Sequence, residues 1–265
     1  MRAAKRLAAV EKRIREHRHV ILTVLILLVL SAAIAFGTYK VFFVVDNVAV
    51  SGSETYGEEQ IVEAAGILAG ENLYSFSASD AEGEITFLCP YIRSAKVKRT
   101  VPTSVSITLE DDAAVYYADI WGDTVLLSGG LRVLEAVEAD SPKTEGLVEL
   151  VLPPVDKSVA GRVLEFTSPR AERYIRNVLG QVAASPLWEN GMVDRIELTD
   201  EYEISMKACG LYSLICGGET DMNLKMKMAY VAITSGKLDS EIRATINLKE
   251  TGEAVAMYDF SDSGD

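Results

Sequence analysis

The side chains that most often carry out catalysis or bind metals are few and badly spaced in this sequence. Both histidines, His17 and His19, lie in a basic segment at the N-terminus, and the remaining 246 residues contain none. A Ser-His-Asp or Cys-His catalytic group and a histidine metal site are therefore excluded from the body of the chain. Adjacent carboxylates such as Asp111 and Asp112 would point to opposite faces of a strand, which is poor geometry for acid–base catalysis. The body of the chain therefore shows none of these catalytic arrangements.

The three cysteines are too few for a disulfide scaffold and too scattered for a metal site. Cys89 ends a predicted helix, where we expect a small buried side chain. Cys209 and Cys216 flank a predicted hairpin. The sequence leaves a disulfide between them undecided, because a turn at Cys209 and Gly210 would not make them cross-strand partners. The sequence also lacks the glycine-rich motifs that cradle phosphates, so we expect no cofactor.

The charge of the chain changes sign near its N-terminus. The formal net charge is −13, but the first 19 residues hold seven basic and two acidic side chains, a net +5. The residues after them hold 19 basic and 37 acidic side chains, a net −18. Such an acidic body does not favour a nucleic-acid backbone, so nucleic acid is excluded as a partner.

Residues 20–39 (VILTVLILLVLSAAIAFGTY) carry no charge and predict a membrane-spanning helix from Val20 through Leu28 to Tyr39. A helix of about 20 residues, at about 1.5 Å per residue, spans the hydrocarbon core of a bilayer. Because basic residues precede the span, the positive-inside rule places residues 1–19 in the cytoplasm, beside anionic lipid, and the body outside.

A cleaved signal peptide is the alternative to this membrane anchor. The small residues Ala33 and Ala35 fit a cleavage site. Against cleavage, the apolar run is longer than an ordinary signal peptide requires, and it continues past Ala35. In either case the body is exported.

After the span, the residue pattern predicts a small α+β domain. β-Branched or alternating residues indicate strands, and apolar residues at helical spacing indicate helices. Pro90 ends the second helix, in which we expect Ile85, Phe87 and Leu88 to face inward. The expected order is a strand at 42–50, helices near 58–65 and 79–88, and strands at 92–99 and 105–110.

The rest of the chain reads as strands separated by turns, with two helices between them. The first of these helices has Ser168 as its cap and Pro169 as its first residue. In the second, at 221–234, we expect Leu224, Met228 and Val231 to face inward. The expected strands are at 115–120, 124–128, 131–135, 147–152, 193–198, 202–207, 213–216, 244–249 and 254–258.

Motifs spread over nearly the whole chain share the order and spacing of one protein family. The strongest is PYIRSAKVKR at 90–99, followed by Pro102 and VSITLE at 105–110. The others are VAVSG at 48–52, GI and GENL at 66–73, LP at 152–153 with GRVL at 161–164, and TINLK at 245–249 with GEAVA at 252–256. Together with the basic tail and the single span, they resemble the FtsQ/DivIB family of bacterial cell-division proteins, whose small domain is a POTRA domain.

Two positions depart from the family pattern. Asp111 and Asp112 stand where arginine and proline commonly follow Glu110, and Ser128 stands where an aspartate usually precedes the third strand of the meander.

The resemblance implies an α+β fold: a single N-terminal transmembrane helix, a POTRA-like β-α-α-β-β domain, then a mixed β-rich domain with two flanking helices. The expected parts are a cytoplasmic basic tail at 1–19, the transmembrane helix at 20–39, the POTRA-like domain at 40–112, the β domain at 113–259 and a disordered acidic tail at 260–265.

The resemblance also implies a function without catalysis, as a scaffold of the divisome in the cell membrane at the division septum. The implied partners are small bitopic coiled-coil proteins of the FtsB/DivIC and FtsL types, together with other divisome membrane proteins. They dock in part by adding a strand to the edge of the outer sheet. The strand that corresponds here consists of Ala254, Val255, Ala256, Met257 and Tyr258.

This strand has the properties that strand addition needs. It contains no proline and no charge, and its alanines would let a partner backbone approach. Met257 and Tyr258 are side chains of the kind that anchor interfaces. The alternative is that Val255 and Met257 pack into the core of their own domain.

Two other functions remain as alternatives. One is an exported hydrolase with paired carboxylates, cleaved after Ala35, although the exported body lacks histidine and a catalytic motif. The other is a POTRA-bearing secretion or assembly component, which would need a transmembrane barrel larger than the remaining 150 or so residues usually form.

Overall fold

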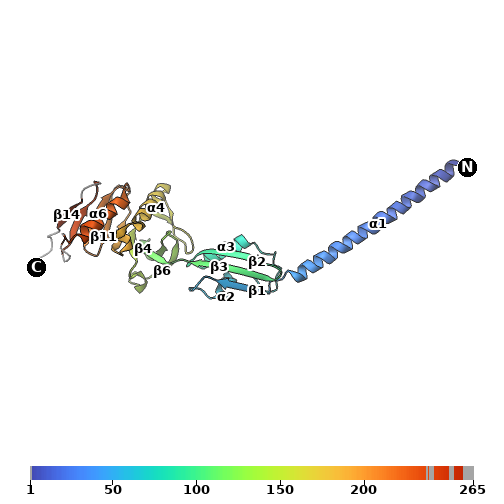
Figure 1. Cartoon of the computed structure of the whole chain (residues 1–265), viewed down its shortest axis with the longest axis horizontal. Helices are drawn as coiled ribbons and strands as arrows, with labels where there is room; N and C mark the ends of the chain where they lie inside the picture. Colours follow the sequence, from blue (N-terminus) through green and yellow to red (C-terminus); the bar gives the residue numbers. More distant parts are fainter. Residues whose placement is uncertain (1, 237, 239–241, 251–253, 259–265) are drawn as a thin grey trace. The chain divides into compact units, whose positions relative to one another are not determined.

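A computed structural model (Figure 1) describes residues 2–236, 238, 242–250 and 254–258, except for the side chains of residues 2–19, 40 and 41. The acidic tail expected at 260–265 lies outside these residues. The chain forms two compact units. The first comprises Met1–Ile85 and Ser94–Leu109, and the second comprises Thr86–Arg93 and Glu110–Asp265. The expected α+β class is confirmed, with a long apolar helix at the start and a β-rich region at the end.

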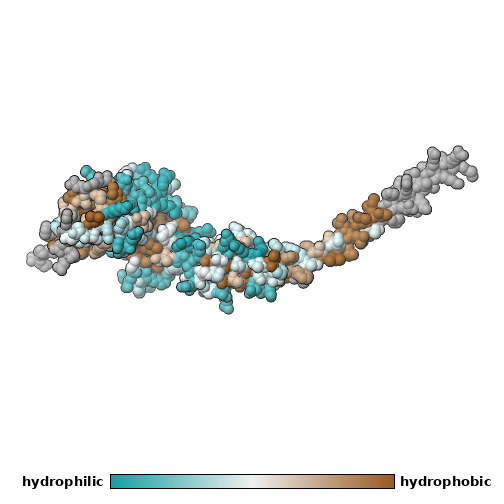
Figure 2. All heavy atoms as spheres, in the orientation of Figure 1, coloured by the Kyte–Doolittle hydropathy of each residue, from teal (hydrophilic) through white to brown (hydrophobic). Residues whose placement is uncertain are grey.

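The first element is the helix α1 (Arg2–Phe42). No residue of its segment Val20–Tyr39 is buried, and Figure 2 shows the apolar surface of this segment. Among the described residues, α1 is the one helix that is long and apolar enough to cross a membrane. The strand expected at 42–50 is shorter than predicted, because α1 continues to Phe42 and the strand begins only at Asn47.

A three-stranded sheet and two helices follow, in the β-α-α-β-β order that the sequence predicts. The strand order in the sheet is β1-β3-β2, and β1 runs parallel to β3. Large buried side chains include Ile61, Leu73, Ile85 and Ile107. The elements are β1 (Asn47–Ser51), α2 (Glu58–Ala64), α3 (Ala78–Leu88), β2 (Ile92–Thr100) and β3 (Ser104–Asp111).

Two side chains of α3 differ from the expectation. Ile85 is fully buried, but Phe87 is 37% exposed and Leu88 is 56% exposed. Ala81 and Ile85 fill the inward face, and the helix ends at Leu88. The last side chains therefore lie beyond the part of the helix that covers the core.

A nine-stranded sheet dominates the second unit, in the order β14-β13-β12-β11-β10-β7-β4-β5-β6. The pairs β4–β7, β7–β10 and β12–β13 are parallel. The predicted meander is present as the antiparallel strands β4, β5 and β6. The strands are β4 (Ala114–Ile120), β5 (Asp123–Ser128), β6 (Val133–Val137), β7 (Val148–Val151), β10 (Val193–Glu197), β11 (Ile204–Ala208), β12 (Tyr212–Gly217), β13 (Ala244–Asn247) and β14 (Val255–Tyr258).

Three helices of the second unit contact one another and share one hydrophobic core with this sheet. The predicted cap is present, since the Ser168 hydroxyl accepts a hydrogen bond from the Arg170 N–H and Pro169 begins the helix. Several short elements were not predicted: α5, the strand pair β8 and β9, and a single turn of 3-10 helix at Pro142–Thr144. The bounds are α4 (Pro169–Ala183), α5 (Pro186–Glu189), α6 (Met222–Thr234), β8 (Val155–Lys157) and β9 (Glu165–Phe166).

The face that α6 turns to the core differs from the expectation. Leu224 and Val231, expected to point inward, are 46% and 63% exposed. The cause is Lys225, which is only 4% exposed and donates from Nζ to the Gly218 carbonyl at 2.9 Å. A hydropathy pattern assigns lysine to solvent, so it misses this rotation of the helix. The buried residues of α6 are Met222, Lys225, Met226 and Ala229.

Candidate functional site

The nine-stranded sheet ends at β14, the strand predicted from the resemblance as the partner-binding edge. Within the described residues, β14 pairs only with β13, in antiparallel register. A strand in this position presents backbone donors and acceptors on its outer side, where another strand can pair with them. The register partners are Asn247 and Val255, Ile246 and Ala256, Thr245 and Met257, and Ala244 and Tyr258.

The hydrogen bonds of β13 indicate which backbone groups of β14 face outward. The N–H groups of Ala244 and Leu248 donate to carbonyls on the β12 side, at 3.4 and 2.8 Å. Backbone groups alternate sides along a strand, so Ile246 also faces β12. In an antiparallel pair, two opposite residues either both direct their backbone N–H and C=O groups toward each other or both direct them to the outer sides. Ala256, opposite Ile246, therefore turns its N–H and C=O toward the open edge.

The side chains at this edge are largely exposed. Val255 and Met257 are 48% and 56% exposed, so they do not pack into the core of their own domain. Ala254 and Ala256 are also exposed, whereas Tyr258 is half-buried and packs against the core. The strand thus combines an outward backbone with uncharged side chains.

An apolar hollow of about 460 Å³ lies beside this edge, on the outer face of α6. Its presence follows from the rotation of α6, which leaves apolar side chains at the surface next to the strand. The sequence does not predict this hollow, since the pattern of α6 assigns Val231, which lines it and is exposed, to the core. The lining residues are Lys227, Met228, Val231, Ala232, Ser235 and Ala254.

The cysteines are free thiols, and Cys209 is exposed whereas Cys89 and Cys216 are buried. Burial raises the pKa of Cys216 to about 12, although the nearby Lys225 opposes this shift. Cys209 lies in the turn between β11 and β12, so it does not oppose Cys216 across the hairpin. Among the described residues, no group of three or more acidic, histidine or cysteine side chains could hold a metal ion.

The residues predicted to mark the membrane span lie along α1. Val20 and Leu28 are 62% and 64% exposed, and Tyr39 at the end of the apolar stretch is 37% exposed. The Tyr39 ring lies against Phe43 and Tyr74, with ring centroids 5.5 and 5.8 Å apart. Aromatic rings at the end of an apolar helix are typical of the membrane–water interface.

Comparison with known families identifies the three-stranded domain. Residues 43–111 match the family model described as "POTRA domain, FtsQ-type". The matched stretch contains β1, α2, α3, β2 and β3, which is the β-α-α-β-β order described above. The POTRA-like domain suggested by the sequence motifs is thereby confirmed.

Two relatives extend the similarity beyond this domain. The chain is 32% identical over 91 residues to the cell division protein FtsQ of Corynebacterium glutamicum, a stretch that covers 34% of the chain and 40% of that protein. It is 24% identical over 136 residues to the cell division protein DivIB of Clostridium botulinum, which covers 51% of the chain and 52% of that protein. The matched stretches thus span about half or less of each relative. The chain thus carries an FtsQ-type POTRA domain and is similar to cell division proteins named FtsQ and DivIB.

Proposed function

We propose that the chain is a single-span membrane scaffold of the bacterial divisome, which works by binding other division proteins during septum formation. The relatives are named as cell division proteins, and α1 supplies one candidate span. The basic tail at 1–19 would lie in the cytoplasm, and the POTRA-like domain at 40–112 and the β domain at 113–259 would lie outside. The protein would collect at the division septum.

The observation that carries this proposal is the outward backbone of Ala256 on an exposed, uncharged edge strand. We propose that small bitopic coiled-coil proteins of the FtsB/DivIC and FtsL types add a strand there. Because side chains alternate, Val255 and Met257 would contact one face of the added strand. Ala254 lines the hollow on α6, so that hollow would receive apolar side chains from the other face.

Calorimetry on the full chain in lipid nanodiscs tests this site, with the extracytoplasmic segments of both partner types as titrants. The informative variant is Ala256→Pro. Proline removes the outward N–H at the edge, while Val255 and Met257 keep their hydrogen bonds to β13. We expect binding to weaken by about tenfold or more, with an unchanged unfolding temperature.

Ala256→Ser is the matched control, because it alters the same side chain and keeps the N–H. We expect it to bind within about threefold of the wild type. Full binding by Ala256→Pro would place the partner elsewhere on the chain. No binding of any of these segments by the wild type would contradict the scaffold function itself.

A further inference from the structure

The first unit carries most of its exposed large apolar side chains at one end. Beyond the apolar stretch of α1, the exposed large apolar residues of this unit are Phe42 (63%), Leu68 (62%), Tyr74 (48%) and Val101 (58%). Three of them, Phe42, Tyr74 and Val101, lie on the segments that surround the end of α1. Apolar residues exposed singly need no explanation, whereas residues gathered on one face mark a contact surface.

Tyr74 is held directly against α1. Its ring stacks on the Tyr39 ring, with centroids 5.8 Å apart, and meets the Phe43 ring edge-on at 5.7 Å. The Asn72 side chain donates to the Tyr39 carbonyl at 3.4 Å, and the Leu73 N–H donates to the Phe43 carbonyl at 2.7 Å. Since Tyr39 ends the apolar stretch, the loop that carries Tyr74 lies at the level where the helix would leave the hydrocarbon core.

Val101 lies at the same end, on the turn between β2 and β3. The Thr103 carbonyl, on the same turn, accepts from the N–H of Asp46, which comes shortly after α1, at 2.8 Å. Arg99 lies between this turn and the loop of Tyr74, since its guanidinium is 5.7 Å from the Tyr74 ring centroid. The turn and the loop thus form one surface around the end of α1.

This surface lacks the charge that attraction to anionic lipid would need. Its segments are 42–46, 70–76 and 99–103. Their charged residues are Asp46, Glu71 and Arg99. The Arg99 guanidinium is already engaged, because it donates to the carbonyls of Leu73 and Phe76. The surface is therefore apolar and aromatic rather than basic.

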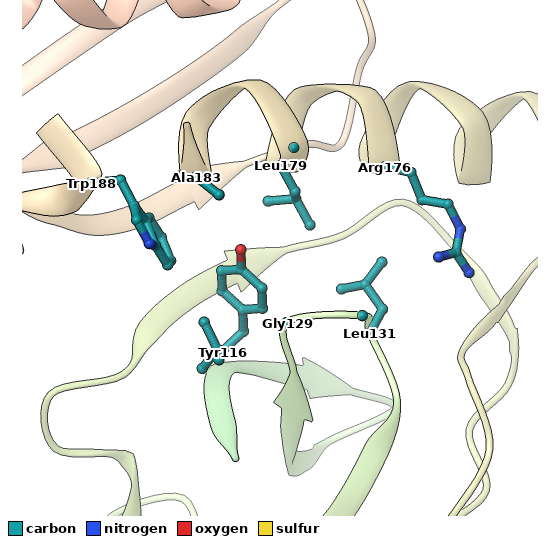
Figure 3. A pocket seen from close by; sticks show the side chains of 10 residues that line it. Tyr116, Gly129, Leu131, Arg176, Leu179, Ala183 and Trp188 are labelled. Atoms are coloured by element: carbon teal, nitrogen blue, oxygen red, sulfur yellow. The ribbon is translucent and has the colours of Figure 1, made fainter. Parts of the chain in front are cut away.

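A cavity in the second unit shows how apolar groups are covered elsewhere in the chain. It has a volume of about 350 Å³ and lies between α4 and the turn that joins β5 to β6 (Figure 3). Its walls include Leu131 and Leu179, which are only 1% and 5% exposed, and Arg176 beside it pairs with Glu172 at 3.1 Å. Packing within the unit covers those leucines, whereas the apolar side chains around the end of α1 stay exposed.

We propose that Phe42, Tyr74 and Val101 form a juxtamembrane face, which lies in the interfacial layer of the membrane that α1 spans and holds the POTRA-like domain against the lipid. Aromatic rings favour this layer, where one side is apolar and the other is wet. Lipid is the occupant because the face continues directly from the apolar stretch through the Tyr39 ring. The inference rests on the proposed function only in taking α1 to be the membrane span.

Fluorine NMR of the full chain in lipid bicelles, labelled with fluorotyrosine, tests the proposal on native side chains. The chain has 11 tyrosines, and phenylalanine variants assign their resonances. The probe is phosphatidylcholine with a doxyl spin label near the top of its acyl chain, which broadens the resonances of nearby groups. We expect strong broadening at Tyr39 and Tyr74, and much less at Tyr56, which lies beyond the far end of β1.

Val101→Ser separates the juxtamembrane face from mere proximity to α1. It removes one exposed apolar side chain and leaves the contact between Tyr39 and Tyr74, so the unfolding temperature should not change. We expect the doxyl broadening at Tyr74 to fall by about twofold or more, and broadening by a water-soluble gadolinium chelate to rise. Leu68→Ser is the matched control and should change neither, because Leu68 is equally exposed but lines a groove beside Val48, farther along β1.

The outcomes separate this inference from the proposed function. Broadening at Tyr39 without broadening at Tyr74 would overturn the inference and leave α1 as a span, whereas no broadening at Tyr39 would contradict the span as well. The inference also fails if Val101→Ser leaves the broadening at Tyr74 unchanged.

Two further results would overturn it. Shielding of Tyr74 from the gadolinium chelate without broadening by the doxyl lipid would mean that a second copy of the chain covers the face. Broadening at Tyr74 that requires added phosphatidylglycerol would mean that charge, and not the apolar face, attracts the lipid. We expect equal broadening with and without that anionic lipid.

Discussion

At the scale of single residues, Gly52 is a position where one added carbon has no space. Its φ is +96°, and a Cβ there would lie 2.1 Å from the carbonyl oxygen of Leu109. We expect Gly52→Ala to lower the free energy of unfolding by about 2–4 kcal/mol, through backbone strain and the clash together. Circular dichroism of the full chain in urea would measure the loss.

Gly66 is the matched control for this prediction. Its φ is +64°, but an added Cβ would meet no atom within 4 Å. Gly66→Ala should therefore cost only about 1 kcal/mol, from the left-handed backbone alone. Equal losses in the two variants would show that the close approach to Leu109 contributes nothing.

Glu135 should make the stability of the second unit depend on pH. Its carboxylate accepts hydrogen bonds from the Tyr91 hydroxyl at 2.6 Å and from the Lys143 ammonium at 2.7 Å. Partial burial alone would raise the pKa of Glu135. The hydrogen bonds from Lys143 and Tyr91, with the charge of Lys143, outweigh that effect and hold the pKa below its ordinary value of 4.5.

A carboxyl group whose pKa is lower in the folded state than in the unfolded state stabilises the folded protein at pH values above the unfolded-state pKa. This stabilisation is lost as the pH falls through the folded-state pKa. We expect Glu135→Gln to cost about 1 kcal/mol at neutral pH. The difference from the wild type should shrink below about pH 4.5, where the carboxylate becomes protonated. Urea unfolding at a series of pH values measures it, and a constant difference down to acidic pH would contradict this assignment.

At the scale of elements, the start of α4 is held by the Ser168 hydroxyl, which accepts from the Arg170 N–H. Ser168→Ala should lower the free energy of unfolding by about 1 kcal/mol, whereas Ser168→Gly should cost only a few tenths. Both variants lack the hydroxyl, but glycine suits the extended backbone of a cap better than alanine does. Urea unfolding of both variants checks this, and a larger loss for glycine would argue against capping.

The elements that the sequence predicts well are those whose signal is local. The cap at Ser168, the alternation in β3 and the meander of β4, β5 and β6 all depend on neighbours in the chain. The rotation of α6 does not depend on such neighbours, because it requires the hydrogen bond from Lys225 to the Gly218 carbonyl. β8 and β9 were likewise missed, since each is only two or three residues long and exists through its partner.

The signals that mark β14 as a candidate site are likewise partly local and partly non-local. The uncharged composition of β14 is visible in the sequence, but its position at the edge depends on the order of nine strands.

At the scale of the whole molecule, the proposed orientation in the membrane gives a prediction for the cysteines. A membrane-impermeant maleimide added to spheroplasts that contain the full chain should label Cys209, which is exposed, and spare the buried Cys89 and Cys216. Burial and the charge of Asp194 raise the pKa of Cys209, so labelling should be slow at neutral pH and faster as the pH rises.

Cys209→Ser should abolish this labelling, which makes it the control for the assignment. Labelling that requires permeabilised spheroplasts would instead place the second unit in the cytoplasm. Rapid labelling at all three cysteines would show that the second unit is unfolded under these conditions.

The open edge at β14 also has a consequence for the protein in isolation. A sheet with an uncharged outer strand offers the same template to a second copy of the chain as to a partner. Val255–Tyr258 contains neither the lysine nor the proline with which many proteins guard such strands against aggregation. We therefore expect the purified chain to aggregate slowly as its concentration rises, and a partner seated on β14 to act as a chaperone for the chain it binds.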